Sequence, residues 1–169
     1  PALIAVETRL SAQNFAFGKQ IRDIGAKKYY AQCMAYKKIH FMASRAKDAQ
    51  SALVALQKRY SAVDLEQADV IVALGGDGQM LETLHATQHL DTPVYGMNRG
   101  TVGFLMNGYD EQDLYVRLNA AEEAVIHPLK MVADCADGRA FEALAINEVS
   151  LLRHGPQAAK LRISVDGRV

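Results

Sequence analysis

The sequence predicts an α/β fold, with a parallel sheet and flanking helices, followed by the start of an antiparallel all-β domain. The first indication is the run from Val70 to Leu74, which is apolar, rich in β-branched residues and free of polar alternation, as in strands covered on both faces. The second is the alternation of strand-like and helix-like segments between residues 38 and 124. The third is a change after residue 124 to short runs separated by Asp137-Gly138 and Asp166-Gly167, which are hairpin-turn dipeptides.

The elements of the α/β part follow in a regular order along the chain. Short apolar runs predict three strands, at residues 39–43, 70–74 and 94–97. Apolar residues at three- and four-residue spacing predict three helices, within residues 44–59, 78–88 and 110–121. Ser44 is placed to cap the first helix, and Pro93 stops the second. The apolar face of the second helix contains Met80, Leu81 and Leu84.

Three segments of the chain differ in character. Residues 1–37 carry six Lys or Arg against two acidic residues and show weak periodicity, so we expect an N-terminal extension of uncertain order. Residues 38–124 are expected to form an α/β nucleotide-binding domain. Residues 125–169 are expected to form the first part of an all-β domain. Its apolar runs predict strands at residues 129–134, 141–146, 149–153 and 161–165.

The composition argues against several classes of protein. Nineteen basic residues balance nineteen acidic ones, so no net positive charge favours nucleic acid as a partner. No apolar run reaches the ~18–20 residues that a membrane span needs. Two cysteines are too few for a disulfide scaffold, which favours a reducing, cytoplasmic setting. We therefore expect a cytoplasmic protein that has neither nucleic acid nor a membrane as its partner.

The stretch Gly75-Gly76-Asp77-Gly78 is the first candidate for chemistry. It follows the apolar strand directly, and the carboxyl ends of parallel strands are where α/β sheets bind ligands. Glycines there let the backbone approach a phosphate at a helix N-terminus. A carboxylate in such a place could take a proton from a hydroxyl nucleophile or help to hold Mg²⁺. The alternative is that Asp77 only begins the helix, where an acidic residue is favoured.

Two further stretches have unusual residues for their place. Residues 98–105 contain Asn98, Gly100 and Gly103 after the next strand, which predicts a second ligand-facing loop, with Phe104 placed to stack on a base. The alternative is that Phe104 belongs to the core. We expect Asn147-Glu148 to lie inside an apolar strand, where polar side chains are costly unless satisfied, and its groups suit ribose hydroxyls. A strand edge that faces solvent is the alternative for this pair.

Taken together, the three stretches resemble the NAD kinase family. They read Gly-Gly-Asp-Gly-x-Met-Leu, then Asn-x-Gly-x-x-Gly-Phe-Leu, then Asn-Glu-Val after a series of short strands. The resemblance covers residues 38–169. It implies a Rossmann-like α/β nucleotide domain followed by an all-β domain, usually in dimers or tetramers. It also implies that the protein phosphorylates the 2′-hydroxyl of the NAD adenosine ribose, with Mg²⁺ or another divalent metal and with ATP, or in some members polyphosphate, as donor.

The resemblance also implies a role for individual residues. Asp77 matches the general base of the family, and Asn147 and Glu148 match the pair that holds NAD ribose hydroxyls. Phe104 matches the aromatic residue near adenine. The other residues expected at the nucleotide site are Gly75, Gly76, Gly78, Asn98 and Gly103. No cluster of acidic residues would hold a metal alone, so nucleotide phosphates would have to supply ligands.

Two departures from the family pattern bear on the prediction. Gln79 stands where the family most often has Thr. The sequence also has no match to the family's later segment that completes the NAD site, so the chain is expected to be the amino-terminal part of such an enzyme. Two alternatives remain open: a nucleotide-binding fragment without activity, and a lipid kinase that shares the Gly-Gly-Asp-Gly motif. The leading hypothesis predicts that Asp77→Asn abolishes turnover and spares NAD binding.

Overall fold

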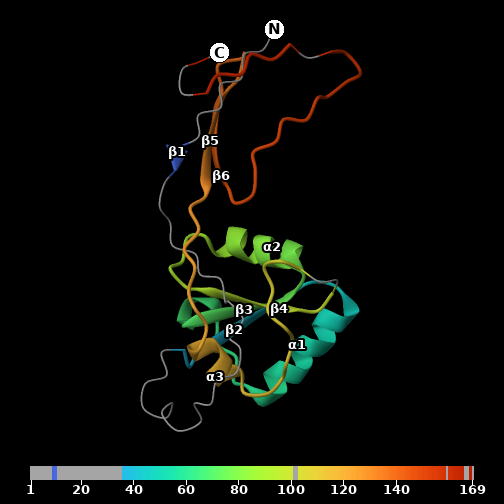
Figure 1. Cartoon of the computed structure of the whole chain (residues 1–169), viewed down its shortest axis with the longest axis vertical. Helices are drawn as coiled ribbons and strands as arrows, with labels where there is room; N and C mark the ends of the chain where they lie inside the picture. The colour runs from blue at the N-terminus through green and yellow to red at the C-terminus, as the bar shows by residue number, and fades with distance from the viewer. Residues whose placement is uncertain (1–8, 11–35, 101–102, 159, 166–167, 169) are drawn as a thin grey trace.

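A three-stranded parallel sheet forms the centre of the α/β unit (Figure 1). The computed structural model describes residues 9–10, 36–100, 103–158, 160–165 and 168. The sheet contains β2 (Ile39–Ala43), β3 (Val70–Gly75) and β4 (Val94–Asn98) in the order β2-β3-β4. Every residue of β3 is buried, which agrees with the unbroken apolar run in its sequence. The parallel strands expected from the sequence are therefore confirmed (Figure 1).

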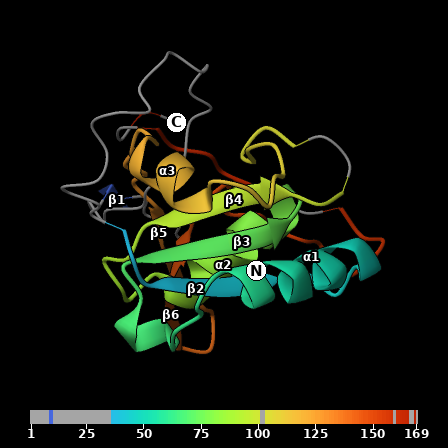
Figure 2. The same cartoon turned by 90° about the horizontal axis from the view of Figure 1, so that it is seen from below.

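Helices cover both faces of this sheet. The helices are α1 (Lys47–Arg59), α2 (Asp77–Thr87) and α3 (Leu114–Asn119), and a short 3-10 helix spans Leu65–Gln67. The buried residues of α1 and α3 pack with one face of the sheet, whereas Met80 and Leu84 of α2 pack with Ile71 and Ala73 on the other. Figures 1 and 2 show this arrangement, with α2 across the sheet from α1 and α3. The parallel sheet and its helices thus form a three-layered α/β unit.

A second, antiparallel sheet lies on the α2 side of the parallel sheet (Figure 1). Its strands are β1 (Arg9–Leu10), β5 (Leu129–Asp134) and β6 (Ala140–Ala145), in the order β1-β5-β6. The turn between β5 and β6 contains Gly138 at a φ of 82°, a conformation that favours glycine. Ile126 and Ile146, just outside this sheet, pack against the α2-side core. The expected change from an α/β unit to an antiparallel sheet is confirmed.

Two helix starts differ from the expectations. The N-cap of α1 is Ala46, without a side-chain cap bond, and the N–H of Ser44 instead donates to the Leu74 carbonyl at 2.9 Å. Ser44 thus extends the sheet and does not cap the helix. The helix expected from residue 110 begins only at Leu114, because Asp113 takes a left-handed φ of 51° that interrupts helical geometry.

The last two expected strands are not formed in the described part of the chain. Residues 149–158 and 160–164 belong to no helix or strand. Val165 pairs only with Arg168, in an isolated antiparallel bridge around the expected Asp166-Gly167 turn. The turn residues themselves lie outside the described residues, as does most of the N-terminal segment. A strand needs a neighbour for its backbone groups, and no described segment pairs with residues 149–153.

The helices in the described residues are all too short or too polar to cross a bilayer.

Candidate active site

The Gly-Gly-Asp-Gly stretch lies where the sequence places it, at the junction of β3 and α2. Gly75 ends β3, Gly76 is the N-cap of α2 and Asp77 is the first helical residue. A Cβ at Gly75 would lie 2.6 Å from the Gln79 Cβ, so this glycine is required by the packing of the turn. Beside Gly76 and Gly78 a Cβ would meet no atom within 4 Å. The backbone at these two glycines is therefore open to a ligand.

The Asp77 carboxylate joins this junction to the second glycine-containing segment. Its Oδ2 accepts a hydrogen bond from the Phe104 N–H and its Oδ1 accepts one from the Leu105 N–H, both at 2.9 Å. The two motifs, more than twenty residues apart in sequence, are thus brought into direct contact. The carboxylate is held by two backbone donors and is not an isolated helix-starting acid.

The second segment, residues 98–100 and 103–107, is named the Phe104 loop. Its two ends meet on β4, where the Asn98 N–H donates to the Asn107 carbonyl at 2.8 Å. The Asn107 N–H and its side-chain amide both donate to the Gly96 carbonyl, at 2.9 and 3.1 Å. The Asn98 side-chain oxygen accepts the Gly100 N–H at 3.0 Å, which forms a local turn. The loop is therefore fixed at its base by backbone pairing and at Phe104 and Leu105 by Asp77.

The side chain of Phe104 is fully exposed, with a relative exposure of 102%. The alternative that this ring belongs to the core is therefore wrong. Because its own N–H is bound to Asp77, the ring is presented from a backbone position that is fixed close to the carboxylate. Such a ring can stack on a base.

Asn147 and Glu148 lie apart from these contacts. Both side chains are exposed and follow the end of β6 at Ala145, outside any strand. The expectation that they interrupt an apolar strand is wrong, because the strand ends before them and solvent reaches both groups. In the described residues neither side chain is hydrogen-bonded to Asp77 or to the Phe104 loop. The structure thus brings together two of the three motifs.

The charged groups around the Phe104 loop are engaged with one another. The Arg99 guanidinium lies 4.1 Å from the centre of the Tyr109 ring, and the Tyr109 hydroxyl donates to Glu111 at 2.9 Å. Burial, with the bond to Glu111, raises the pKa of Tyr109 to about 12. The described residues hold no group of three or more His, Cys, Asp or Glu side chains that could bind a metal ion. Asp77 would therefore need nucleotide phosphates as further ligands to take part in holding a divalent metal.

Sequence reasoning missed Asn107, the buried residue that closes the Phe104 loop on β4. Its neighbours are Met106 and Gly108, and an Asn before a Gly is usually interpreted as an exposed turn. The signal that could have identified it is the need for a partner at the end of β4, where Asn98 would otherwise lack an acceptor. It is a structural residue of the loop.

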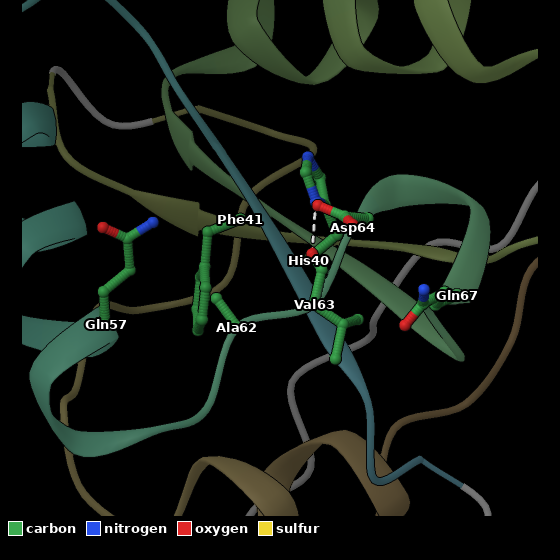
Figure 3. A pocket seen from close by; sticks show the side chains of 7 residues that line it. All are labelled: His40, Phe41, Gln57, Ala62, Val63, Asp64 and Gln67. Carbon is green, nitrogen blue, oxygen red and sulfur yellow. Dashed lines mark hydrogen bonds between the residues drawn. The ribbon is translucent and has the colours of Figure 1, made fainter.

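A depression elsewhere in the α/β unit has none of the predicted site residues in its wall. It has a volume of about 440 Å³ and lies between β2 and the segment that precedes β3. The His40 ring nitrogen Nδ1 is 2.9 Å from the Val63 carbonyl oxygen, which joins its two sides (Figure 3). Its β2 residues His40 and Phe41 pair with Ile71 and Val72 in the first half of β3, whereas Asp77 follows the end of β3. The depression and the Asp77 contacts are therefore different places.

Comparisons with known proteins agree with the motifs. Residues 7–124 match the family model described as the ATP-NAD kinase N-terminal domain, which begins well before the motif-based resemblance at residue 38. The chain is 62% identical over 136 residues to an NAD kinase of Cereibacter sphaeroides, covering 80% of this chain and 54% of that protein. It is 59% identical over 132 residues to the NAD kinase of Caulobacter vibrioides, covering 78% and 51%. The chain therefore spans about half the length of the curated relatives that it matches.

Proposed function

Because this chain belongs to the NAD kinase family, we propose that the protein transfers a phosphoryl group from ATP to the 2′-hydroxyl of the NAD adenosine ribose. The observation that carries the proposal is the contact of the Asp77 carboxylate with the backbone of Phe104. This contact joins a carboxylate that can accept a proton to an aromatic ring that can stack on adenine. Both lie at the carboxyl end of β3, where α/β sheets bind nucleotides. The alternative of a lipid kinase is not retained, because the matched family is that of NAD kinases.

In the proposed reaction Asp77 acts as the general base. The ribose oxygen forms a bond to the γ-phosphorus of ATP, the bond from that phosphorus to the ADP oxygen breaks, and the hydroxyl proton passes to the Asp77 carboxylate. General-base assistance of this kind contributes ~10²–10⁴-fold to a rate. Mg²⁺ or another divalent cation, when bound, would neutralise phosphate charge, with phosphate oxygens among its ligands.

The remaining residues would bind the nucleotides. The open backbone at Gly76 and Gly78 supports a close approach of phosphate or ribose there, next to Gly75. The exposed ring of Phe104 would stack on adenine. The Asn147 amide would donate hydrogen bonds to ribose hydroxyls and accept them, and the Glu148 carboxylate would accept them, which their exposure permits. The other proposed binding residues, both in the Phe104 loop, are Asn98 and Gly103.

We further propose a cytoplasmic protein that works as a homodimer or homotetramer. The Cys135 thiol is free, which suits a reducing compartment. Assembly from several copies is supported by the family resemblance alone. Light scattering of the purified protein at several concentrations measures the number of copies directly.

The test is NADP formation from NAD, ATP and Mg²⁺. It compares the 169-residue chain with a form as long as its curated relatives, each as wild type and as Asp77→Asn. We expect wild-type turnover in the longer form and a loss of ~10²–10⁴-fold in the variant. Turnover retained in Asp77→Asn would remove this residue from the base role. Gln112→Asn, a surface change on the segment before α3, is the matched control and should keep wild-type turnover.

A second candidate function applies to the 169-residue chain by itself. Asn147 and Glu148 make no bond to the Asp77 region in the described residues, and the chain spans half the length of its relatives. The chain alone would then bind nucleotide without catalysis. A rise in melting temperature with NAD but no NADP product would support this candidate. NADP formed by the 169-residue chain would exclude it.

A further inference from the structure

We propose that Asp77 is also a positioning residue, whose carboxylate sets the place of the Phe104 ring relative to the proposed reacting hydroxyl. The ligand-binding part of this inference rests on the proposed function, whereas its structural part does not. The sequence alone led us to expect that Asp77→Asn would leave NAD binding intact. The contacts in the structure argue for a different result.

The backbone at Phe104 and Leu105 depends on the Asp77 carboxylate for its position. Each carboxylate oxygen accepts one backbone N–H at 2.9 Å, from two consecutive residues. The Phe104 ring contributes no packing, because it is fully exposed. Leu105 is only partly buried against the α2-side core. Hydrogen bonds to an ionised acceptor are stronger than those between neutral groups. These two bonds are therefore the main constraint on the backbone at Phe104 and Leu105.

Gly103 explains why this contact is possible. A Cβ at this position would lie 2.3 Å from the Asp77 Oδ1 and 2.8 Å from its Cγ, closer than any real contact. The short Asp77 side chain starts from the first residue of α2, so it can yield only by moving away from both N–H donors. Gly103 therefore lacks a side chain because the carboxylate occupies that space. From the sequence alone, we had expected a glycine at this position because the loop faces a ligand.

The positioning role is compatible with the role of a base. An ionised carboxylate has about four acceptor positions, and the two loop amides use two of them. The remaining positions can accept a ribose hydroxyl. One carboxylate would then hold both the hydroxyl and the backbone that carries the stacking ring, which fixes the distance between them. Substitutions that displace the carboxylate should therefore weaken NAD binding as well as turnover.

The structural part is tested by amide hydrogen exchange, measured by NMR in the 169-residue chain without ligand. We expect the Phe104 and Leu105 amides to be protected in the wild type and to exchange about tenfold faster or more in Asp77→Asn and in Gly103→Ala. The carboxamide that replaces the carboxylate in the first variant has a single acceptor oxygen in place of two, so it cannot reproduce both bonds. Gly100→Ala is the matched control in the same loop, because a Cβ there meets no atom within 4 Å. It should leave both amides protected.

Two results would overturn the positioning role. One is a pair of amides that are unprotected in the wild type, and the other is unchanged protection in both variants. Asp77→Asn is nearly isosteric, so it remains informative if Gly103→Ala fails to fold.

The ligand-binding part is tested by the affinity for NAD in the form as long as the curated relatives. We expect Asp77→Asn and Gly103→Ala each to weaken NAD binding about tenfold, and the double variant to be little weaker than either, because both changes break one contact. Unchanged NAD affinity in both variants would contradict this part. Faster amide exchange in a protein that neither binds NAD nor forms NADP would overturn the proposed function and leave the positioning role standing. If Asp77→Asn instead loses turnover while its Phe104 and Leu105 amides stay protected, the positioning role is overturned and the proposed function stands.

Discussion

Tyr60 acts as the cap of a helix that lies far from it in sequence. Its hydroxyl accepts the Leu114 N–H at 3.1 Å and donates to the Glu111 carbonyl at 2.8 Å. The N-cap of α3, Asp113, provides no side-chain cap bond, so Tyr60 satisfies the N–H that a cap would normally serve. The residue is buried, and water cannot easily replace it.

Tyr60→Phe should therefore lower the free energy of unfolding by about 1–3 kcal/mol, since it leaves buried polar groups without partners. Urea denaturation followed by circular dichroism measures the change. Tyr115→Phe is the matched control, because the Tyr115 ring packs edge-on against Tyr60 at 5.3 Å while its hydroxyl bonds to no described residue. The control should cost less than half as much. Equal losses in the two variants would show that the hydroxyl of Tyr60 is not the cause.

Single residues of the site could be predicted where their immediate neighbours in the sequence mark them as unusual. Asp77 and Phe104 stand out because an acid among glycines and an aromatic residue after a glycine are unusual in a turn. Their contact was not predictable, because it joins segments that periodicity treats separately. The exposure of Asn147 and Glu148 depends on where β6 ends, and strand ends are set by pairing partners that the sequence does not identify.

At the scale of elements, β4 and the Phe104 loop form one unit. A Cβ at Gly96, in the middle of β4, would lie 2.5 Å from the Met106 Sδ and 3.4 Å from the Leu105 carbonyl oxygen. The returning segment of the loop thus packs directly on this glycine. The close approach of another backbone is a usual reason for glycine within a strand.

Gly96→Ala should destabilise the fold by about 1–3 kcal/mol, because the Met106 side chain must move from a packed position. Shortening that side chain relieves the collision. The double variant Gly96→Ala/Met106→Ala should therefore be more stable than the sum of the two single changes predicts, as residues in contact are not additive. Thermal melts of the four proteins supply the comparison. Additive losses would mean that Gly96 and Met106 do not meet in solution.

The order of strands and helices was predictable, but element ends were less so. The run at residues 70–74 predicted β3 because a strand buried on both faces needs apolar residues throughout. The start of α3 was set four residues too early, because the helix begins only after the left-handed residue Asp113, where the Tyr60 hydroxyl bonds to Glu111 and Leu114. Local helix propensity cannot identify a cap that a residue more than fifty positions away supplies.

For the whole molecule, burial divides the described chain into two unequal parts. Apart from Pro128, the buried residues of the described chain lie between Ile39 and Leu118, in the α/β unit. No residue of β5 or β6 is fully buried, and Leu152 has a relative exposure of 97%. Stability is therefore concentrated in the α/β unit, since few apolar contacts and few backbone bonds mark the regions that open most easily.

Limited proteolysis of the 169-residue chain should follow this division. Trypsin is expected to cut first after the exposed residues Arg153, Lys160 and Arg162, which lie in the described stretch after β6 that contains no helix or strand. Cleavage after Arg59 or Arg117 requires α1 or α3 to open, because both residues are helical and these helices pack on the sheet. Opening of packed elements costs several kcal/mol more than opening of exposed segments, so cleavage there should be at least about tenfold slower.

Mass spectrometry of the products over time gives the order of cleavage. The same chain in urea is the control, because every site should then be cut at a similar rate. A product that ends at Arg153 should accumulate while residues 36–153 remain joined. Cleavage at Arg59 or Arg117 as early as at Arg153 would mean that the α/β unit does not hold its core independently. The site that Asp77 and Phe104 form would then lack the rigid support on which its proposed chemistry depends.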